Sequence, residues 1–223
     1  MCNAVSVRIA GYGMKHKLNQ IILADCMDIM RDIPDKYFEL AIVDPPYGIG
    51  KDGQTKSTGV HGGRKAHAHK GWDNKIPGVE YFTELFRISN NQIIWGGNYF
   101  AMYLPSSMGW IFWDKGQRIN QSDGELAFSS FQRALRVAEY NRWELIKDGT
   151  IHPAQKPVAL YRWLLQNYAK PDDKIIDTHS GSGSCAIACH IEKHDFLAIE
   201  KDPDYHAASV KRLEETMAQG VLF

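Results

Sequence analysis

Short apolar runs alternate with helix-like segments along most of the chain. The run Glu39–Val43 is apolar after its first residue and ends at Asp44-Pro45-Pro46, as expected for a strand buried in a parallel sheet. Pro157 precedes Val158–Tyr168, whose apolar residues recur at helical spacing. Asp202-Pro203 supplies an N-cap and a first-turn proline to a final helix. This alternation predicts an α/β fold.

The pattern predicts one domain over residues 20–223, preceded by an N-terminal extension at 1–19, with no internal repeat. Strands are expected at Gln20–Leu23, Glu39–Val43, Gln92–Trp95, Trp110–Trp113, Glu125–Ser129, Lys174–Asp177 and Asp195–Ile199. Helices are expected at Met27–Ile33, Val79–Ile88, Asn98–Leu104, Val158–Tyr168, Ser184–Glu192 and from Asp202 to about Ala218. The sum is a sheet of about seven strands with helices between them.

Composition narrows the class of protein. Among 223 residues, 44% are hydrophobic and 23% charged, which is typical of a globular domain and excludes whole-chain disorder. The 26 Lys and Arg residues balance 26 Asp and Glu residues, which argues against a strongly basic polyanion binder but permits a local basic face. Four scattered cysteines favour a reducing compartment over a disulfide scaffold.

No membrane segment or secretory signal is predicted. Residues 1–20 have no apolar core, so no secretory signal is expected there. Ile88–Trp113 carries no charged residue, but its Asn, Gln, Gly, Pro and Ser residues favour a buried globular core over a bilayer span.

The first chemical motif is Asp44-Pro45-Pro46-Tyr47, at the strand end where open α/β sheets bind ligands. The two prolines lack amide hydrogens, so the backbone presents only carbonyl oxygens there. Asp44 and the Pro45 carbonyl offer two acceptors, and Tyr47 adds a flat π face. This set suits a planar ring with an exocyclic amino group, although a plain turn with a surface tyrosine also fits the tetrapeptide alone.

The second motif is the glycine-rich segment Asp177–Gly183, which follows a predicted strand. Glycines let a ligand approach the backbone closely. The next strand is followed by Glu200, and an acid about 20 residues beyond such a turn commonly binds ribose hydroxyls. The spacing fits any nucleoside cofactor, but the strict GxGxxG of dinucleotide folds is absent. A tight strand-to-helix turn without a ligand is the alternative.

The third motif, His152–Pro157, precedes the helix Val158–Tyr168. Lys156 near a helix N-terminus can meet a carboxylate, since the ammonium and the helix dipole both attract anions. The loop histidines His61, His67 and His69 would need a fourth ligand, so no metal site is predicted.

Together, the three motifs resemble those of S-adenosylmethionine-dependent DNA amino-methyltransferases. Their order, with Asp44–Tyr47 first and Asp177–Gly183 last, resembles the circularly permuted β group of the DPPY type. The resemblance runs from about residue 18 to 215, and it implies a Rossmann-like fold: a mostly parallel sheet with helices on both faces. It also implies that Asp44 and the Pro45 carbonyl bind the target amine, with Tyr47 stacking on a flipped base. The amine would attack the cofactor methyl group directly and in line.

The resemblance also implies a set of cofactor contacts. The methionine end of the cofactor would contact the glycine-rich loop, and the ribose would contact Glu200. The adenine would lie near Asp25. The complete catalytic set is Asp44, Pro45, Pro46 and Tyr47, and the complete cofactor-binding set is Asp25, Cys26, His152, Gln155, Lys156, Asp177, His179, Ser180, Gly181, Ser182, Gly183 and Glu200.

The sequence departs from the family pattern in two places. Thr178-His179 stands where the family usually has Pro-Phe, so an imidazole replaces the aromatic ring that flanks the cofactor. Only residues 115–150 remain for target recognition, a reduced region that leaves the recognised sequence open.

In the family, an aspartate such as Asp44 goes mostly with adenine N6, which is favoured here over cytosine N4. No cysteine follows a proline, so the C5-cytosine mechanism is not expected. A catalytically silent relative and an RNA or protein methyltransferase are the remaining alternatives.

Double-stranded DNA is the expected partner. Residues 48–75 lack periodicity and predict a mobile basic loop, in which Lys51–Lys75 carries a local charge of +4. The expected phosphate contacts are Lys51, Lys56, Arg64, Lys65 and Lys70, and the second candidates are Arg118, Arg133, Arg136 and Arg142. A solvated loop is the alternative. We expect a prokaryotic or phage-infected cytoplasm, and the sequence leaves open a homodimer and a cognate restriction enzyme for the same site.

Overall fold

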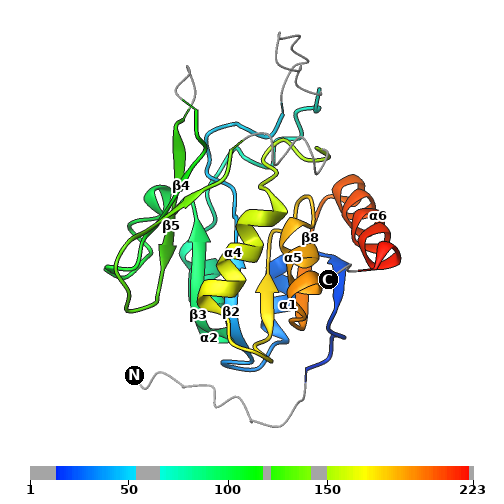
Figure 1. Ribbon diagram of the computed structural model, residues 1–223, viewed down its shortest axis with the longest axis horizontal. Helices are drawn as coiled ribbons and strands as arrows, with labels where there is room; N and C mark the ends of the chain where they lie inside the picture. The colour runs from blue at the N-terminus through cyan, green and yellow to red at the C-terminus, as the bar shows by residue number, and fades with distance from the viewer. Residues whose placement is uncertain (1–13, 54–65, 118–121, 142–149, 221–223) are drawn as a thin grey trace, which may run out of the picture.

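The computed structural model describes residues 14–53, 66–117, 122–141 and 150–220 (Figure 1). Its strands are β1 (Gln20–Leu23), β2 (Phe38–Val43), β3 (Ser89–Trp95), β4 (Ile111–Asp114), β5 (Gly124–Ser129), β6 (Arg136–Glu139), β7 (Ile175–Asp177) and β8 (Phe196–Glu200). Its helices are α1 (Cys26–Arg31), α2 (Val79–Ile88), α4 (Val158–Tyr168), α5 (Ser184–Glu192) and α6 (Pro203–Gln219), with a 3₁₀ turn, η1, at Gly97–Tyr99.

The strands form one sheet in the order β1-β8-β7-β2-β3-β5-β4-β6. Every pair is parallel except β3–β5 and β4–β5, so β5 alone runs against the others. The α/β fold with a mostly parallel sheet is therefore confirmed. The sheet has one strand more than the sequence predicted. This strand, β6, buries only Ala138 and has no apolar run that would reveal it.

Helices cover both faces of the sheet, as expected (Figure 1). Successive side chains of β2 point to opposite faces, because a strand alternates. Leu40 and Ile42 pack in a core with residues of α4, α5 and α6, while Ala41 and Val43 pack in a second core with residues of α1 and α2. This double burial explains why the β2 sequence is continuously apolar.

One predicted helix takes a different form. The sequence predicted a short helix at Asn98–Leu104, where the structure has the single 3₁₀ turn η1. The preceding residue, Gly96, adopts a left-handed conformation with φ of 70°, and a Cβ atom there would overlap the Tyr47 ring. The chain therefore turns sharply beside Tyr47, and only glycine fits at this point.

The parallel register brings the sequence motifs to one edge of the sheet. β2 pairs with β7 and β7 with β8, so Asp44, Thr178 and Lys201 follow three adjacent strands at their carboxyl ends. Ligands of open α/β sheets bind at this edge. Within the described parts of the chain, no helix combines the length and the apolar character that a bilayer crossing needs.

Candidate functional site

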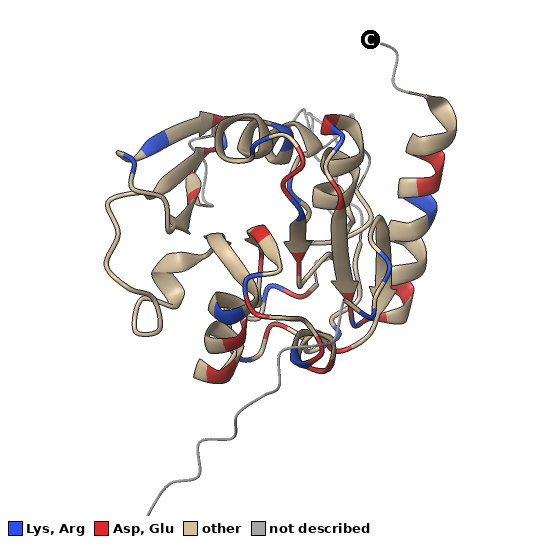
Figure 2. Cartoon of the chain, turned by 90° about the horizontal axis from the view of Figure 1, so that it is seen from below, with Lys and Arg blue, Asp and Glu red and all other residues tan. Residues whose placement is uncertain are grey.

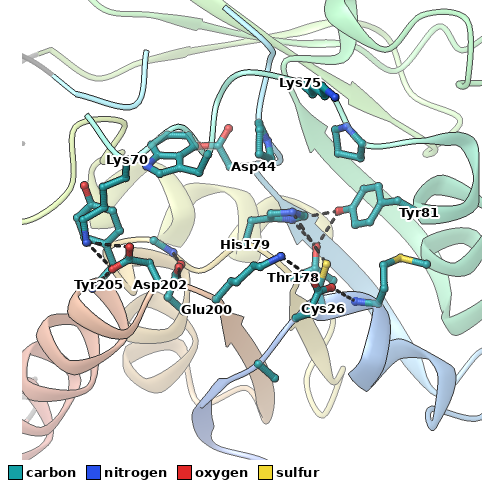
Figure 3. A pocket seen from close by; sticks show the side chains of 18 of the residues that line it. Cys26, Asp44, Lys70, Lys75, Tyr81, Thr178, His179, Glu200, Asp202 and Tyr205 are labelled. Atoms are coloured by element: carbon teal, nitrogen blue, oxygen red, sulfur yellow. Dashed lines mark hydrogen bonds and ion pairs between the residues drawn. The ribbon is translucent and has the colours of Figure 1, made fainter. Parts of the chain in front are cut away.

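A cavity of about 650 Å³ opens at the carboxyl edge of the sheet (Figure 3). This volume lies in the range of small-molecule sites. Its walls come from the ends of β1, β2, β7 and β8, from residues 70–81, from His152 and from the start of α6. Nine residues that the sequence predicted for the site line it: Asp25, Cys26, Asp44, Pro46, Lys70, His152, His179, Gly181 and Glu200.

The glycine-rich turn and Glu200 form one corner of the cavity. Glu200 Oε2 accepts a hydrogen bond from the Gly181 amide at 2.7 Å, and Oε1 accepts one from the Asp202 amide at 2.8 Å. Gly181 and Gly183 have φ of 51° and 72°, so the turn uses conformations that favour glycine. Burial raises the pKa of Glu200 above its ordinary value. Glu200 thus fixes the turn while its carboxylate still borders the cavity.

The remaining loop residues lie behind the turn. Ser180 is buried, and its hydroxyl has no hydrogen-bond partner within the described residues. Ser182 faces α5 and α6, since its hydroxyl contacts Ser184 at 3.0 Å and its carbonyl accepts from Arg212. Asp177 is also buried; burial raises its pKa to about 8, although its Oδ1 accepts from the His179 amide.

A second side of the cavity carries His179 and its neighbours. The imidazole lies edge-on to the Tyr81 ring at 5.2 Å, and its Nδ1 is 3.0 Å from the Thr178 hydroxyl. Burial lowers the pKa of His179 to about 4, so the ring is neutral at physiological pH. Burial also raises the pKa of the Cys26 thiol to about 12, which makes it a poor nucleophile.

Asp25 begins α1 at the same side. Its Oδ1 caps the helix by accepting from the Met27 amide at 2.9 Å, and its Oδ2 pairs with Lys201 Nζ at 2.7 Å.

An aromatic stack forms the opposite wall. The Trp72 ring stacks on His152 at 5.1 Å, and His152 lies edge-on to Tyr205 at 4.3 Å. Burial lowers the pKa of His152 to about 3, so this ring is also neutral. Lys70 Nζ pairs with Asp202 at 2.7 Å (Figure 3). It also pairs with Asp204 at 2.7 Å. The segment that carries Trp72 is thus fastened to the start of α6.

Two buried aspartates hold the described ends of the loop after β2. Asp73 accepts from the amides of Gly48 and Lys51 at 2.9 and 2.7 Å. Asp52 accepts from the amides of Lys70 and Gly71. The described parts of this predicted loop are therefore tied together by buried carboxylates.

Asp44 lies at the centre of the site and belongs to an ionic cluster. Tyr47 donates to Asp44 Oδ1 at 2.6 Å, and Lys156 Nζ donates to Asp44 Oδ2 at 2.5 Å. Lys156 Nζ also contacts Glu125 Oε2 at 3.0 Å, and Lys115 Nζ contacts Glu125 Oε1 at 2.5 Å. Burial raises the pKa of Asp44, while the Lys156 ammonium opposes this effect.

Several predicted residues lie elsewhere. Lys156 and Gln155 are buried but do not border the cavity, and Gln155 Oε1 instead accepts from the Ile151 amide at 3.0 Å. One face of the Tyr47 ring is stacked on Tyr99, with centroids 5.0 Å apart. Pro45 is buried at the end of β2.

The predicted DNA contacts are only partly described. Lys56, Arg64, Lys65, Arg118 and Arg142 lie outside the described residues. Lys51 is exposed, as is Arg136 on β6, while Arg133 lies over the Tyr168 ring. Acidic and basic residues interleave along the described chain (Figure 2). Sequence reasoning missed Trp72, Tyr81, Glu125 and Tyr205, since none stands in a recognisable motif.

A family model described as DNA methylase, for N6 and N4 enzymes, matches residues 94–211, which is more than half of the chain. The chain belongs to the N6/N4 DNA methylase family. It is therefore a DNA methyltransferase, and the family covers both adenine and cytosine enzymes. The match includes His152, Asp177 and Glu200 but begins after the Asp44 tetrapeptide.

Relatives of this DNA methyltransferase agree with the assignment. It is 24% identical to the type II methyltransferase M2.MboI of Moraxella bovis, over 87% of each chain. It is 23% identical to M.HinfI of Haemophilus influenzae, over 89% of this chain and 69% of that one.

Solved structures share its fold. The M1.HpyAVI–SAM complex superposes with a TM-score of 0.59 at 19% identity, covering 87% of this chain and 98% of that one. The cytosine-N4-specific PvuII DNA methyltransferase gives a TM-score of 0.59 at 14% identity, covering 92% and 94%.

Proposed function

We propose that this enzyme transfers the methyl group of S-adenosylmethionine to the exocyclic N6 amine of adenine in double-stranded DNA. The observation that carries the proposal is that Asp44 and Glu200 border one cavity, although they stand at opposite ends of the sequence. An amine-binding carboxylate and a ribose-binding carboxylate are what a methyl transfer between a base and a nucleoside cofactor requires.

The cavity fits this cofactor chemically. Glu200 offers acceptor lone pairs to ribose hydroxyls. The backbone turn at Gly181 borders the cavity without a side chain, so a ligand can approach it closely. The rings of His179 and Tyr81, both uncharged, suit a flat heterocycle. The similarity in fold to the solved M1.HpyAVI–SAM complex supports the choice. When bound, S-adenosylmethionine supplies an electrophilic methyl group.

We assign the cofactor contacts to Asp25, Glu200 and the turn at Gly181, with Trp72 and His152 as the covering wall. Lys70 belongs to this wall in our proposal, because its ammonium already pairs with Asp202 and Asp204. The predicted loop residues that do not border the cavity, such as Asp177 and Ser182, would shape the turn from behind.

At the other end of the cavity, Asp44 would accept hydrogen bonds from the target amine and orient its lone pair. A carboxylate has about four acceptor positions, and the described contacts with Tyr47 and Lys156 use two of them. Burial makes the Cys26 thiol a poor nucleophile. In our proposal the residues therefore act by positioning and electrostatics, without a covalent intermediate.

The finer assignments are part of the same proposal. The motif order supports the β-group, DPPY subtype, and Asp44 at the head of the tetrapeptide favours adenine over cytosine N4. Residues 20–223 would form one catalytic domain, in which 115–150 is a short target-recognition region. The bacterial type II relatives support a prokaryotic cytoplasm and a restriction enzyme acting on the same site.

The test uses purified full-length protein, labelled S-adenosylmethionine and duplex DNA from a strain without DNA methylation. After digestion to nucleosides, we expect label in N6-methyladenine. Label in N4-methylcytosine would replace adenine by cytosine as the target, and no label in DNA would refute the proposed activity. The Asp44→Ala variant should lose transfer while binding S-adenosylmethionine normally in calorimetry.

A further inference from the structure

Glu125 reaches the Asp44 cluster from β5, the strand that runs against the rest of the sheet. Its Oε1 lies 2.5 Å from Lys115 Nζ, and its Oε2 lies 3.0 Å from Lys156 Nζ and 3.2 Å from the Tyr47 hydroxyl. Its side chain is only 22% exposed. No sequence motif includes this residue, and the proposed function gives it no role so far.

The four charged groups of the cluster alternate in sign. Lys115, Glu125, Lys156 and Asp44 follow one another in space, each in contact with the next. The sum of their charges is zero, which removes the large cost of burying an unpaired charge. The cluster is thus built as a unit, in which Glu125 joins the two lysines.

Lys156 is fully coordinated within this unit. An ammonium has three donors. Those of Lys156 face Asp44 Oδ2 at 2.5 Å, Glu125 Oε2 at 3.0 Å and the Tyr47 hydroxyl at 3.3 Å. Because its side chain is only 3% exposed, water has little access as a substitute partner. The position of the ammonium therefore depends on Glu125 as well as on Asp44.

We propose that Glu125 is a positioning residue for methyl transfer: by sharing the Lys156 ammonium with Asp44, it sets the orientation and the charge of the carboxylate that receives the target amine. This inference rests on the proposed function. Without Glu125, Lys156 pairs with Asp44 alone, and a tighter pair makes Asp44 a weaker acceptor for the amine. The Tyr47 hydroxyl, which adjoins Glu125, would also lose part of its fixation.

The negative charge of Glu125 changes the pKa of Asp44 in a direction that can be measured. Glu125 raises the pKa of Asp44 by repulsion, and Lys156 lowers it by attraction. Both carboxylates lie within about 3 Å of the same ammonium, so they are close enough to interact strongly. The titratable groups that act on or respond to Asp44 are Tyr47, Lys156 before α4, Glu125 on β5, Asp177 on β7, Tyr81 on α2 and Tyr161 on α4.

The test compares the wild-type protein with Glu125→Gln, Glu125→Asp and Lys115→Gln. Glu214→Gln is the matched control, because it removes the same charge from an exposed position on α6. Each full-length protein is assayed for methyl transfer to unmethylated DNA from about pH 5 to about pH 9, with kcat, KM for DNA and the Kd for S-adenosylmethionine measured separately.

For Glu125→Gln we expect kcat to fall about tenfold, with the Kd for S-adenosylmethionine unchanged. The acidic limb of its pH profile should move to lower pH by about one unit, because one negative charge near Asp44 is lost. Lys115→Gln removes a positive charge and should move the limb to higher pH. Glu125→Asp should restore the wild-type limb.

The inference would be overturned if the acidic limb of the pH profile of Glu125→Gln stays in place or moves to higher pH. If that variant fails to fold, Lys115→Gln decides, and an unshifted limb there has the same meaning. Failure of the proposed function looks different, since the wild-type protein and Glu214→Gln would then leave DNA unmethylated at every pH.

Discussion

Glu200 offers the sharpest test of the proposed cofactor site. Its two carboxylate oxygens accept from two different amides, those of Gly181 at 2.7 Å and Asp202 at 2.8 Å. In Glu200→Gln the side chain keeps its shape, but an amide has one acceptor oxygen and one NH2 donor group. One of the two backbone N–H groups must then face another donor.

Glu200→Gln should lower both the stability of the protein and its affinity for S-adenosylmethionine. An unsatisfied buried donor costs about 1–3 kcal/mol, and we expect the lower half of this range because Glu200 is only partly buried. For a chain of this length, each kcal/mol lowers Tm by about 2–4 °C. The loss of a charge-assisted hydrogen bond to a ribose hydroxyl should weaken cofactor binding by at least about tenfold.

Scanning calorimetry gives Tm without cofactor, and titration calorimetry gives the Kd for S-adenosylmethionine. Glu214→Gln serves as the control, since it removes an exposed acid far from the cavity. A lowered Tm with an unchanged Kd would show that Glu200 only supports the turn, and the assignment to ribose would be wrong. If neither quantity changes, the hydrogen-bond reasoning itself fails.

Three further predictions concern Trp72, Asp177 and His179. Trp72→Ala removes the stack on His152, so S-adenosylmethionine should dissociate several-fold faster in stopped-flow measurements; an unchanged rate would remove Trp72 from the covering wall. Burial raises the pKa of Asp177 to about 8. Between about pH 4 and about pH 8 this carboxyl is therefore protonated in the folded protein and ionised in the unfolded chain. The contribution of Asp177 to stability is therefore lost as the pH rises from about 4 to about 8, and in denaturant titrations the stability difference between the wild-type protein and Asp177→Asn should change accordingly over this interval. The pKa of His179 is lowered to about 4 by burial, so its contribution to stability is lost as the pH falls from about 6.5 to about 4. His179→Phe should lose less stability over this interval, and an equal loss in both proteins would contradict the pKa assignment.

The fold could be predicted where local pattern and tertiary burial agree. The apolar run of β2 indicated a strand covered on both faces, and the structure buries its alternate residues in two separate cores. β6 could not be predicted, because an edge strand with one buried residue leaves no pattern in the sequence. The turn at η1 depends on Tyr47, which a local reading of residues 98–104 cannot include.

The candidate site also contains residues that the sequence could predict and residues that it could not. Asp44, Gly181 and Glu200 stand at the ends of parallel strands, so their convergence follows from the topology once the strands are recognised. Glu125 stands 78 residues from Tyr47 on an antiparallel strand, and its approach depends on the β3–β5 register. No spacing rule relates such residues, so this contact required the structure.

Two lysines near the site, Lys70 and Lys156, pair with carboxylates of the protein itself, which bears on the zero net charge of the chain. Sequence reasoning placed Lys70 on DNA phosphates and Lys156 on the cofactor, because a basic side chain near a binding motif suggests an anionic ligand. In the structure each of them pairs with two carboxylates of the protein. Lys70 pairs with Asp202 and Asp204 at the start of α6, and Lys156 pairs with Asp44 and Glu125. Basic residues at this edge therefore balance the acids that the chemistry needs, which is one reason why the overall charge can be zero in a DNA-modifying enzyme. Among the described residues, our proposed phosphate contacts then rest on exposed side chains outside the cavity, such as Lys51 and Arg136.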